Sequence, residues 1–270
     1  ARALAQADGA GVTPLLAACG AGSVELVDLL LAAAADPEAA DHEGYGAALH
    51  AAASGDVPLL AALLDRGLAT LTECANDGTT PLLSAAAGGG AEMLGWLLDG
   101  PSGAAATPCL QERDARGADC LLVAAEAGAV EALREAMRRG ASSAVVDDSG
   151  CGVMHYAAAG GHTSALEFCA RCLRASCSAR DEGGDTPLII AAHQGNLEAV
   201  EWLLRHGSSL SERNSDGMSA AMAAAAGEQA AVLQFFARKG GDELWMDELS
   251  RHPGLVLNFV ELGAGRMEDV

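Results

Sequence analysis

The chain has 270 residues, half of them apolar, and a net charge of −21 from 37 acidic and 16 basic residues. A surface this acidic disfavours nucleic acid and anionic membrane surfaces as partners, because phosphate groups are bound through Lys and Arg. Only 3% of the residues are aromatic and 33 are glycine, so the composition favours closely packed small side chains over a core of large ones.

A short turn recurs seven times along the chain, at intervals of 33 to 39 residues. Each turn ends in a glycine, which accepts a positive φ, and in six turns Asp or Asn stands three residues earlier, where its side chain bonds the backbone. The glycines are Gly11, Gly44, Gly78, Gly117, Gly150, Gly184 and Gly217, and the earlier residues are Asp8, Asp41, Ala75, Asp114, Asp147, Asp181 and Asn214. A period of this length indicates a repeat protein.

Two helices are predicted after each turn. The first is a short Ala-rich helix, and five of the seven begin next to a residue whose side chain can cap a helix: Thr13, Thr80, Asp119, Thr186 and Ser219. These helices are predicted at residues 15–19, 48–53, 82–87, 121–125, 154–159, 188–192 and 221–226. The second helix carries apolar residues at helical spacing, as in Val24, Val27 and Leu30. Neither helix is long enough to bury its apolar face alone, so each unit must pack on its neighbours.

Residues 181–207, which read DEGGDTPLIIAAHQGNLEAVEWLLRHG, resemble a full ankyrin repeat. The segments Thr13-Pro-Leu-Leu-Ala-Ala18 and Met154-His-Tyr-Ala-Ala-Ala-Gly-Gly-His162 are similar to parts of one. The resemblance implies an all-α fold, an ankyrin-repeat solenoid of paired antiparallel helices joined by β-hairpin-like turns. Departures from the usual Thr-Pro pair include Gly46-Ala47, Asp119-Cys120 and Ser219-Ala220.

The predicted organisation has three parts. Residues 8–240 form seven ankyrin repeats that start near residues 8, 41, 75, 114, 147, 181 and 214. Residues 1–7 are the tail of a preceding repeat or a linker, and residues 241–270 are a degenerate C-terminal capping repeat, because a stack must cover its last apolar face. Residues 100–108 are expected to form an extended loop where the interval lengthens.

No cofactor or metal site is predicted. Cys169, Cys172 and Cys177 have a spacing that suits zinc, but Cys169 takes the place that Leu203 holds in another repeat, so a core position is favoured. His155 and His162 occupy positions that are structural in the resembling family. His193 is expected on the exposed concave side, as a contact residue and not a general base.

Partner binding is the function that the resemblance implies, through the tips of the turns and the exposed side of the first helices. The candidate partner-binding residues are His42, Glu43, Tyr45, Thr79, Arg116, Asp148, Glu182, Asp185, His193, Gln194, Ser215, Asp216 and Met218. Among these candidates Tyr45 is expected to contribute most to binding, because aromatic side chains often dominate the energetics of interfaces.

The resulting hypothesis is a non-catalytic interaction module or scaffold, which is not an enzyme and binds another protein with a basic or mixed-charge segment on an acidic concave face. Two alternatives stay open: a substrate-recruiting part of a larger enzyme, and a structural subunit of a large assembly. No nucleic acid partner and no direct membrane insertion are expected, because glycine and charge interrupt every apolar run. Eight cysteines without a regular pairing pattern favour a reducing, cytoplasmic location, with an upstream targeting signal left open.

Overall fold

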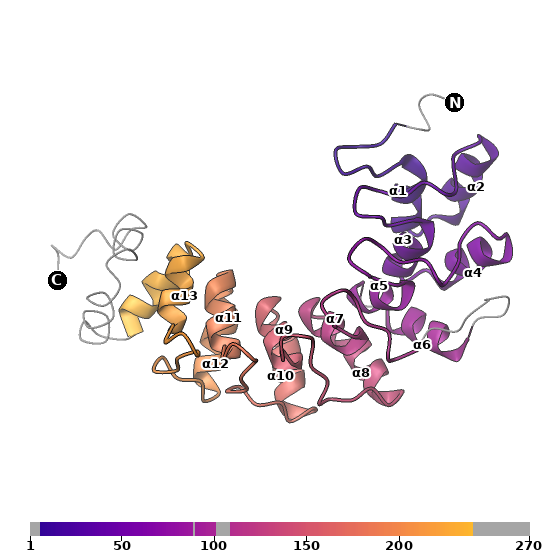
Figure 1. Ribbon diagram of the computed structural model, residues 1–270. Coiled ribbons are helices and arrows are strands. Elements are labelled where there is room, and N and C mark those ends of the chain that lie inside the picture. The colour runs from indigo at the N-terminus through magenta and orange to yellow at the C-terminus, as the bar shows by residue number, and fades with distance from the viewer. Residues whose placement is uncertain (1–5, 89, 101–108, 240–270) are drawn as a thin grey trace. The chain divides into compact units, whose positions relative to one another are not determined.

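The structure is a computed structural model that describes residues 6–88, 90–100 and 109–239. The chain divides into two compact units, Ala1–Asp148 and Ser149–Val270. Every regular element in the described ranges is a helix (Figure 1). The predicted all-α fold of paired helices is confirmed.

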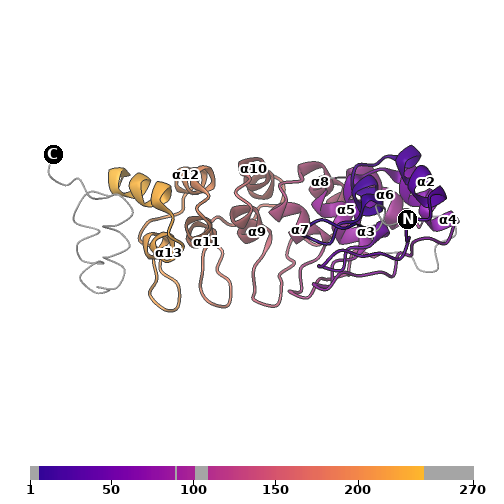
Figure 2. The same ribbon diagram turned by 90° about the horizontal axis from the view of Figure 1, so that it is seen from above.

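The first unit consists of four helix pairs. Its helices are α1 (Pro14–Gly20), α2 (Val24–Ala32), α3 (Ala47–Ser54), α4 (Val57–Asp65), α5 (Pro81–Ala87), α6 (Ala91–Asp99), α7 (Cys120–Glu126) and α8 (Val130–Arg138). The first helices of the pairs, α1, α3, α5 and α7, pack on one another in chain order, and each lies against the second helix of its own pair. The pairs therefore form two layers, with the turns projecting on one side (Figure 2).

The second unit repeats the same arrangement. Its helices are α9 (Val153–Ala159), α10 (Thr163–Arg171), α11 (Pro187–Gln194), α12 (Leu197–Arg205) and α13 (Ala220–Ala226), and residues 230–239 are also helical. Helix α11 packs between α9 and α13, so the first helices again form one layer. The predicted Ala-rich helices agree with the observed first helices to within two residues at each end.

Helix capping explains where most of the first helices begin. The side chains of Thr13, Thr80 and Ser219 each accept a hydrogen bond from the backbone N–H three residues on, and Asp119 accepts from the N–H groups two and three residues on. Thr186 differs from this expectation, because it stands at the N-cap of α11 but its Oγ1 is buried without a hydrogen-bond partner in the described residues.

Small residues allow the first helices to approach closely. The alanines Ala48, Ala51 and Ala52 of α3 are fully buried, and Ser84 of α5 donates its hydroxyl to the carbonyl of Leu49, 2.9 Å away. A Cβ at Gly88 would lie 2.0 Å from the carbonyl oxygen of Ala53. The abundance of alanine and glycine in the sequence is thus a packing requirement.

Part of the predicted organisation falls outside the described residues. The proposed tail at residues 1–7 is described only at positions 6 and 7, the proposed loop at 100–108 only at Gly100, and the proposed cap at 241–270 not at all. We keep the division of residues 8–240 into seven repeats as a proposal, because each proposed repeat contains one turn followed by two helices.

A glutamate links neighbouring helix pairs at the start of the first helices. Glu112 accepts a hydrogen bond from Thr80 Oγ1 at 2.5 Å and another from the backbone N–H of Cys109 at 3.0 Å. Glu73 stands at the equivalent position and accepts from the N–H of Thr70 at 2.7 Å, but it faces Gly46, which has no hydroxyl. The contact made by Thr80 is therefore missing one pair earlier.

Replacing Gly46 with threonine is expected to supply this contact. Gly46 has φ −88° and ψ −174°, which threonine adopts readily, and the added Cβ would lie 3.1 Å from Glu73 Oε2, so the carboxylate must shift by a few tenths of an ångström. We expect Gly46→Thr to raise the free energy of unfolding by about 1 kcal/mol, through a helix cap and one new hydrogen bond. Urea denaturation measures this change in the free energy of unfolding. Thr80→Gly is the reciprocal control and should lose stability. A Gly46→Thr variant that is less stable than the parent would contradict the expected contact with Glu73.

Candidate partner-binding surface

The tips are the four-residue segments that end in the turn glycines, and backbone hydrogen bonds join each tip to the next. The donor is the N–H of the second tip residue and the acceptor is a carbonyl of the preceding tip. In the first unit these bonds run from His42 to Ala10 (2.9 Å), Asn76 to Glu43 (2.9 Å), Ala115 to Asp77 (2.7 Å) and Asp148 to Arg116 (3.0 Å), and in the second from Glu182 to Ser149 (2.9 Å) and Ser215 to Gly183 (2.9 Å). We call this series the tip ladder.

An Asp or Asn at the first position of a tip shapes the turn from within. Asp41 Oδ1 accepts hydrogen bonds from the N–H of Glu43 at 3.0 Å and of Tyr45 at 2.8 Å. Asp8, Asp114 and Asn214 bind their own turns in the same way. These bonds satisfy backbone N–H groups at the surface and hold the exposed tip residues in a fixed backbone conformation.

The turn glycines are needed for two reasons. Gly184 has φ +78°, and a Cβ on it would lie 2.9 Å from the backbone nitrogen of Ser215 in the next tip. Gly44 has φ +87°, and its Cβ would lie 3.0 Å from the nitrogen of Asn76. The positive φ and the close approach of the next tip both exclude other residues.

Acidic side chains dominate the exposed part of the tips. Glu43, Asp77 and Asp148 in the first unit, and Glu182 and Asp216 in the second, are exposed. None of these five carboxylates forms an ion pair with another described residue. The tips therefore present uncompensated negative charge to solvent.

Beside the tips, the C-terminal ends of the first helices are mostly small residues. The equivalent positions are Gly20, Ala53, Ala87, Glu126, Ala159, His193 and Ala226, all exposed or half-buried. His193 and Glu126 are the two large polar side chains in this series. At the other five positions of this series the side chain is small or absent, so the backbone is accessible to a partner.

The thirteen predicted binding residues lie at the surface to different degrees. The exposed ones are His42, Glu43, Arg116, Asp148, Glu182, His193, Gln194, Ser215 and Asp216, and the half-buried ones are Tyr45, Thr79, Asp185 and Met218. All but His193 and Gln194 are in a tip or directly after one. Their part in binding stays a proposal.

Some of the thirteen side chains already have partners within the fold. Tyr45 packs its ring edge on His50, with centroids 6.0 Å apart, and its hydroxyl donates to Asp77 Oδ2 at 3.5 Å. Arg116 forms ion pairs with Asp114 and Glu126, both at 3.0 Å. Asp185 Oδ1 accepts a hydrogen bond from Asn214 at 2.8 Å. These side chains support the tips, so any contact they make with a partner competes with bonds that they already have.

Sequence reasoning missed Asp77 and Glu126. Asp77 occupies the same tip position as Glu43, and Glu126 aligns with His193 at the end of a first helix, so the repeat register contained both signals. Glu126 also ties the fourth tip to α7 through Arg116.

Of the two histidines predicted to be structural, His155 is confirmed, whereas His162 is exposed at the N-cap of α10 and makes no side-chain cap bond. His155 is buried, its Nδ1 accepts the N–H of Gly152 at 3.1 Å, and its Nε2 is 3.2 Å from the carbonyl oxygens of Ala179 and Asp185. Because carbonyls only accept, Nε2 carries the proton. His155 thus joins α9 to the next turn.

The cysteines in the described ranges occupy very different environments. Cys169 is fully buried, as the repeat register predicts, whereas Cys172 is exposed. No group of three or more His, Cys, Asp or Glu residues in the described part of the chain is arranged to hold a metal ion. Within the same ranges no helix is long and apolar enough to cross a bilayer.

Comparison with known proteins identifies one family. The family model for ankyrin repeats (three copies) matches residues 15–107 and 165–245, together more than half of the chain. No curated protein sequence matches.

Thiol reactivity tests the burial of the cysteines. Burial raises the pKa of Cys19 to about 11 and those of Cys120 and Cys169 to about 12, so these thiols carry almost no thiolate near neutral pH. We expect Cys74, Cys109 and Cys172, which are exposed, to react with a maleimide in the native protein, while Cys19, Cys120 and Cys169 react only after unfolding. Mass spectrometry of labelled peptides identifies the modified residues, and labelling of native Cys169 at the rate of Cys172 would contradict its core position.

Proposed function

The chain belongs to the ankyrin repeat family, whose members are generally protein–protein interaction modules and typically non-catalytic, and we propose that it holds another protein against its acidic tips. The partner presents a basic or mixed-charge segment and is not changed covalently. The contact residues are the exposed members of the thirteen candidates, together with Asp77. The tips and the neighbouring ends of the first helices form the proposed binding face.

The observation that carries this proposal is the unpaired negative charge of the tips. Glu43, Asp77, Asp148, Glu182 and Asp216 are exposed and lack ion pairs among the described residues. Many acidic side chains of the second helices differ in this respect: Asp28, Asp99, Glu131 and Glu135 are each paired with an arginine. A carboxylate that is not paired with an intramolecular cation is free to bind a cation from another molecule.

Rigidity supports the same proposal. The tip ladder and the Asx bonds fix the backbone of each tip before a partner arrives, so binding need not order these loops. The small residues along the ends of the first helices let a partner segment lie close to the tips. Surface electrostatics of this kind raises the association rate and selects against acidic partners.

A charge-neutralising variant tests the tips directly. The triple variant Glu43→Gln, Glu182→Gln and Asp216→Asn removes three tip charges while keeping side-chain size and the backbone bonds of the turns. The matched control, Glu25→Gln, Asp65→Asn and Glu198→Gln, removes three exposed charges from the second helices. We expect pull-down with mass spectrometry to recover partners with the parent chain and the control, and to lose them with the tip variant.

The affinity for a recovered partner should fall as the salt concentration rises, because exposed charges are screened. A rim charge contributes about 0.5 kcal/mol, so the tip variant should bind the partner roughly tenfold more weakly in dilute salt. If the tip variant binds every partner as tightly as the control, the tips are not the binding face. Binding that is insensitive to salt would instead favour the permanent subunit of a large assembly.

A further inference from the structure

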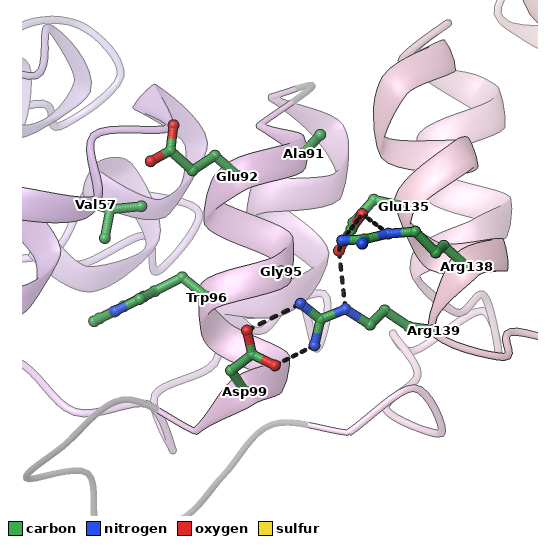
Figure 3. Close-up of a pocket in the computed structure, with 9 residues that line it drawn as sticks. All are labelled: Val57, Ala91, Glu92, Gly95, Trp96, Asp99, Glu135, Arg138 and Arg139. Atoms are coloured by element: carbon green, nitrogen blue, oxygen red, sulfur yellow. Dashed lines mark hydrogen bonds and ion pairs between the residues drawn. The ribbon is translucent and has the colours of Figure 1, made fainter.

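The second helices of the first unit carry a pocket that the tips do not share. Its volume is about 420 Å³, and it lies over α6 between the start of α4 and the end of α8 (Figure 3). The residues that form it are Val57, Ala91, Glu92, Gly95, Trp96, Asp99, Glu135, Arg138 and Arg139. We call it the Trp96 pocket. Its size is in the range that binds small ligands or single side chains.

The Trp96 pocket has two chemically different sides. Val57, Glu92 and Trp96 lie on one side of α6, and Glu135, Arg138 and Arg139 lie on the other (Figure 3). Gly95 separates the two sides, and a Cβ there would lie 2.9 Å from Glu135 Oε1. The missing side chain at this position lets the charged side chains of α8 rest on α6.

The arginines of this pocket are already bound to carboxylates. Arg139 donates to both oxygens of Asp99, with Nη2 to Oδ2 at 3.0 Å, and its Nε donates to Glu135 at 2.9 Å. Arg138 donates to both oxygens of Glu135, each at 2.8 Å. An anionic ligand would have to displace these carboxylates, so the arginine side of the pocket is a poor anion site.

The other side of the pocket presents an aromatic ring and a free carboxylate. Glu92 is exposed and Trp96 is half-buried, and they stand four residues apart on one face of α6. Neither makes an ion pair or a ring contact with another described residue. The three carboxylates of the pocket outnumber its two guanidinium groups.

The second unit contains an internal comparison. Trp202 occupies in α12 the position that Trp96 occupies in α6, the sixth residue of the helix. His206 stacks on Trp202 with ring centroids 3.8 Å apart and planes 15° apart, held by a hydrogen bond of 2.7 Å from Nδ1 to the Trp202 carbonyl. The equivalent residue four positions after Trp96 is Gly100, which has no ring to offer. Both tryptophans are half-buried, but His206, the C-cap residue of α12, stacks on Trp202, whereas no described residue stacks on Trp96.

From this difference we infer that the Trp96 pocket binds an arginine side chain of a partner protein, stacked on Trp96 and paired with Glu92. A guanidinium group suits the site because it is planar, stacks on an indole ring and bonds a carboxylate at the same time. The strongly negative chain attracts such a partner. This site is formed by the second helices, so it does not depend on the proposed role of the tips.

Proton–nitrogen NMR of the full chain tests the inference through the indole N–H signals. The probe is the peptide acetyl-Ala-Arg-Ala-Arg-Ala-amide, and its control replaces both arginines with glutamate. Trp96→Leu and Trp202→Leu assign the indole signals. We expect the arginine peptide to shift the Trp96 signal saturably and to leave the Trp202 signal in place, while the glutamate peptide shifts neither.

The affinity for the arginine peptide, followed by backbone amides of α6, should fall about threefold in Trp96→Leu. Glu92→Gln, a surface change that leaves the core intact, should weaken it about twofold, and Trp202→Leu should have no effect. The inference is overturned if the Trp96 signal does not move, if the glutamate peptide moves it, or if both Trp96→Leu and Glu92→Gln bind like the parent. The tip variant Glu43→Gln, Glu182→Gln and Asp216→Asn should keep the Trp96 shift, so the two proposals fail separately.

Discussion

The tip ladder is the interaction on which the rest of the structure depends. Each helix pair is too short to be stable alone, and consecutive tips come within hydrogen-bond distance only because a glycine stands where a Cβ would touch the next backbone nitrogen. That spacing also sets how closely the first helices pack, and alanine is the side chain that fits between them. The recurring glycine, the recurring Asx residue and the Ala-rich first helix are three consequences of one repeat distance.

Much of this fold can be predicted from the sequence because the same residue types recur at the repeat distance. Gly44 and Gly184 identify the turns, Thr13 and Thr80 identify helix starts, and the place of Cys169 in the repeat identifies it as a core residue. The partners of individual side chains are harder to predict. The bonds that Tyr45 makes with His50 and Asp77, and those of Arg116 with Asp114 and Glu126, join residues whose rotamers depend on packing between repeats. The uncapped start of α11 at Thr186 also depends on a neighbouring repeat. Glu212 stands where Glu112 stands relative to Thr80, and one of its carboxylate oxygens, like Thr186 Oγ1, is buried without a partner among the described residues.

The net charge of −21 becomes informative only when the carboxylates of the second helices are compared with those of the tips. Carboxylates of the second helices are largely neutralised by arginines, as in the cluster of Asp99, Glu135, Arg138 and Arg139. The exposed tip carboxylates of Glu43, Asp77, Asp148, Glu182 and Asp216 have no ion pair among the described residues. The same total charge therefore supports helix packing on one side of each pair and leaves the other side free for a partner. In the Trp96 pocket, Glu92 lacks a cation among the described residues, as Glu25, Asp65 and Glu198 do, and Gly100, four residues after Trp96, lacks a ring.

The claim that the tip ladder holds the turns in place is tested most directly by native-state hydrogen exchange. His42, Asn76, Glu182 and Ser215 are exposed residues whose N–H groups donate to the preceding tip, so their amides should exchange at least about 100-fold more slowly than in an unstructured chain. The amide of Glu43, which bonds only the side chain of its own turn, should be less protected. If the ladder amides instead exchange as fast as an unfolded peptide, the tips are held by the helices alone and the account given for the turn glycines is wrong.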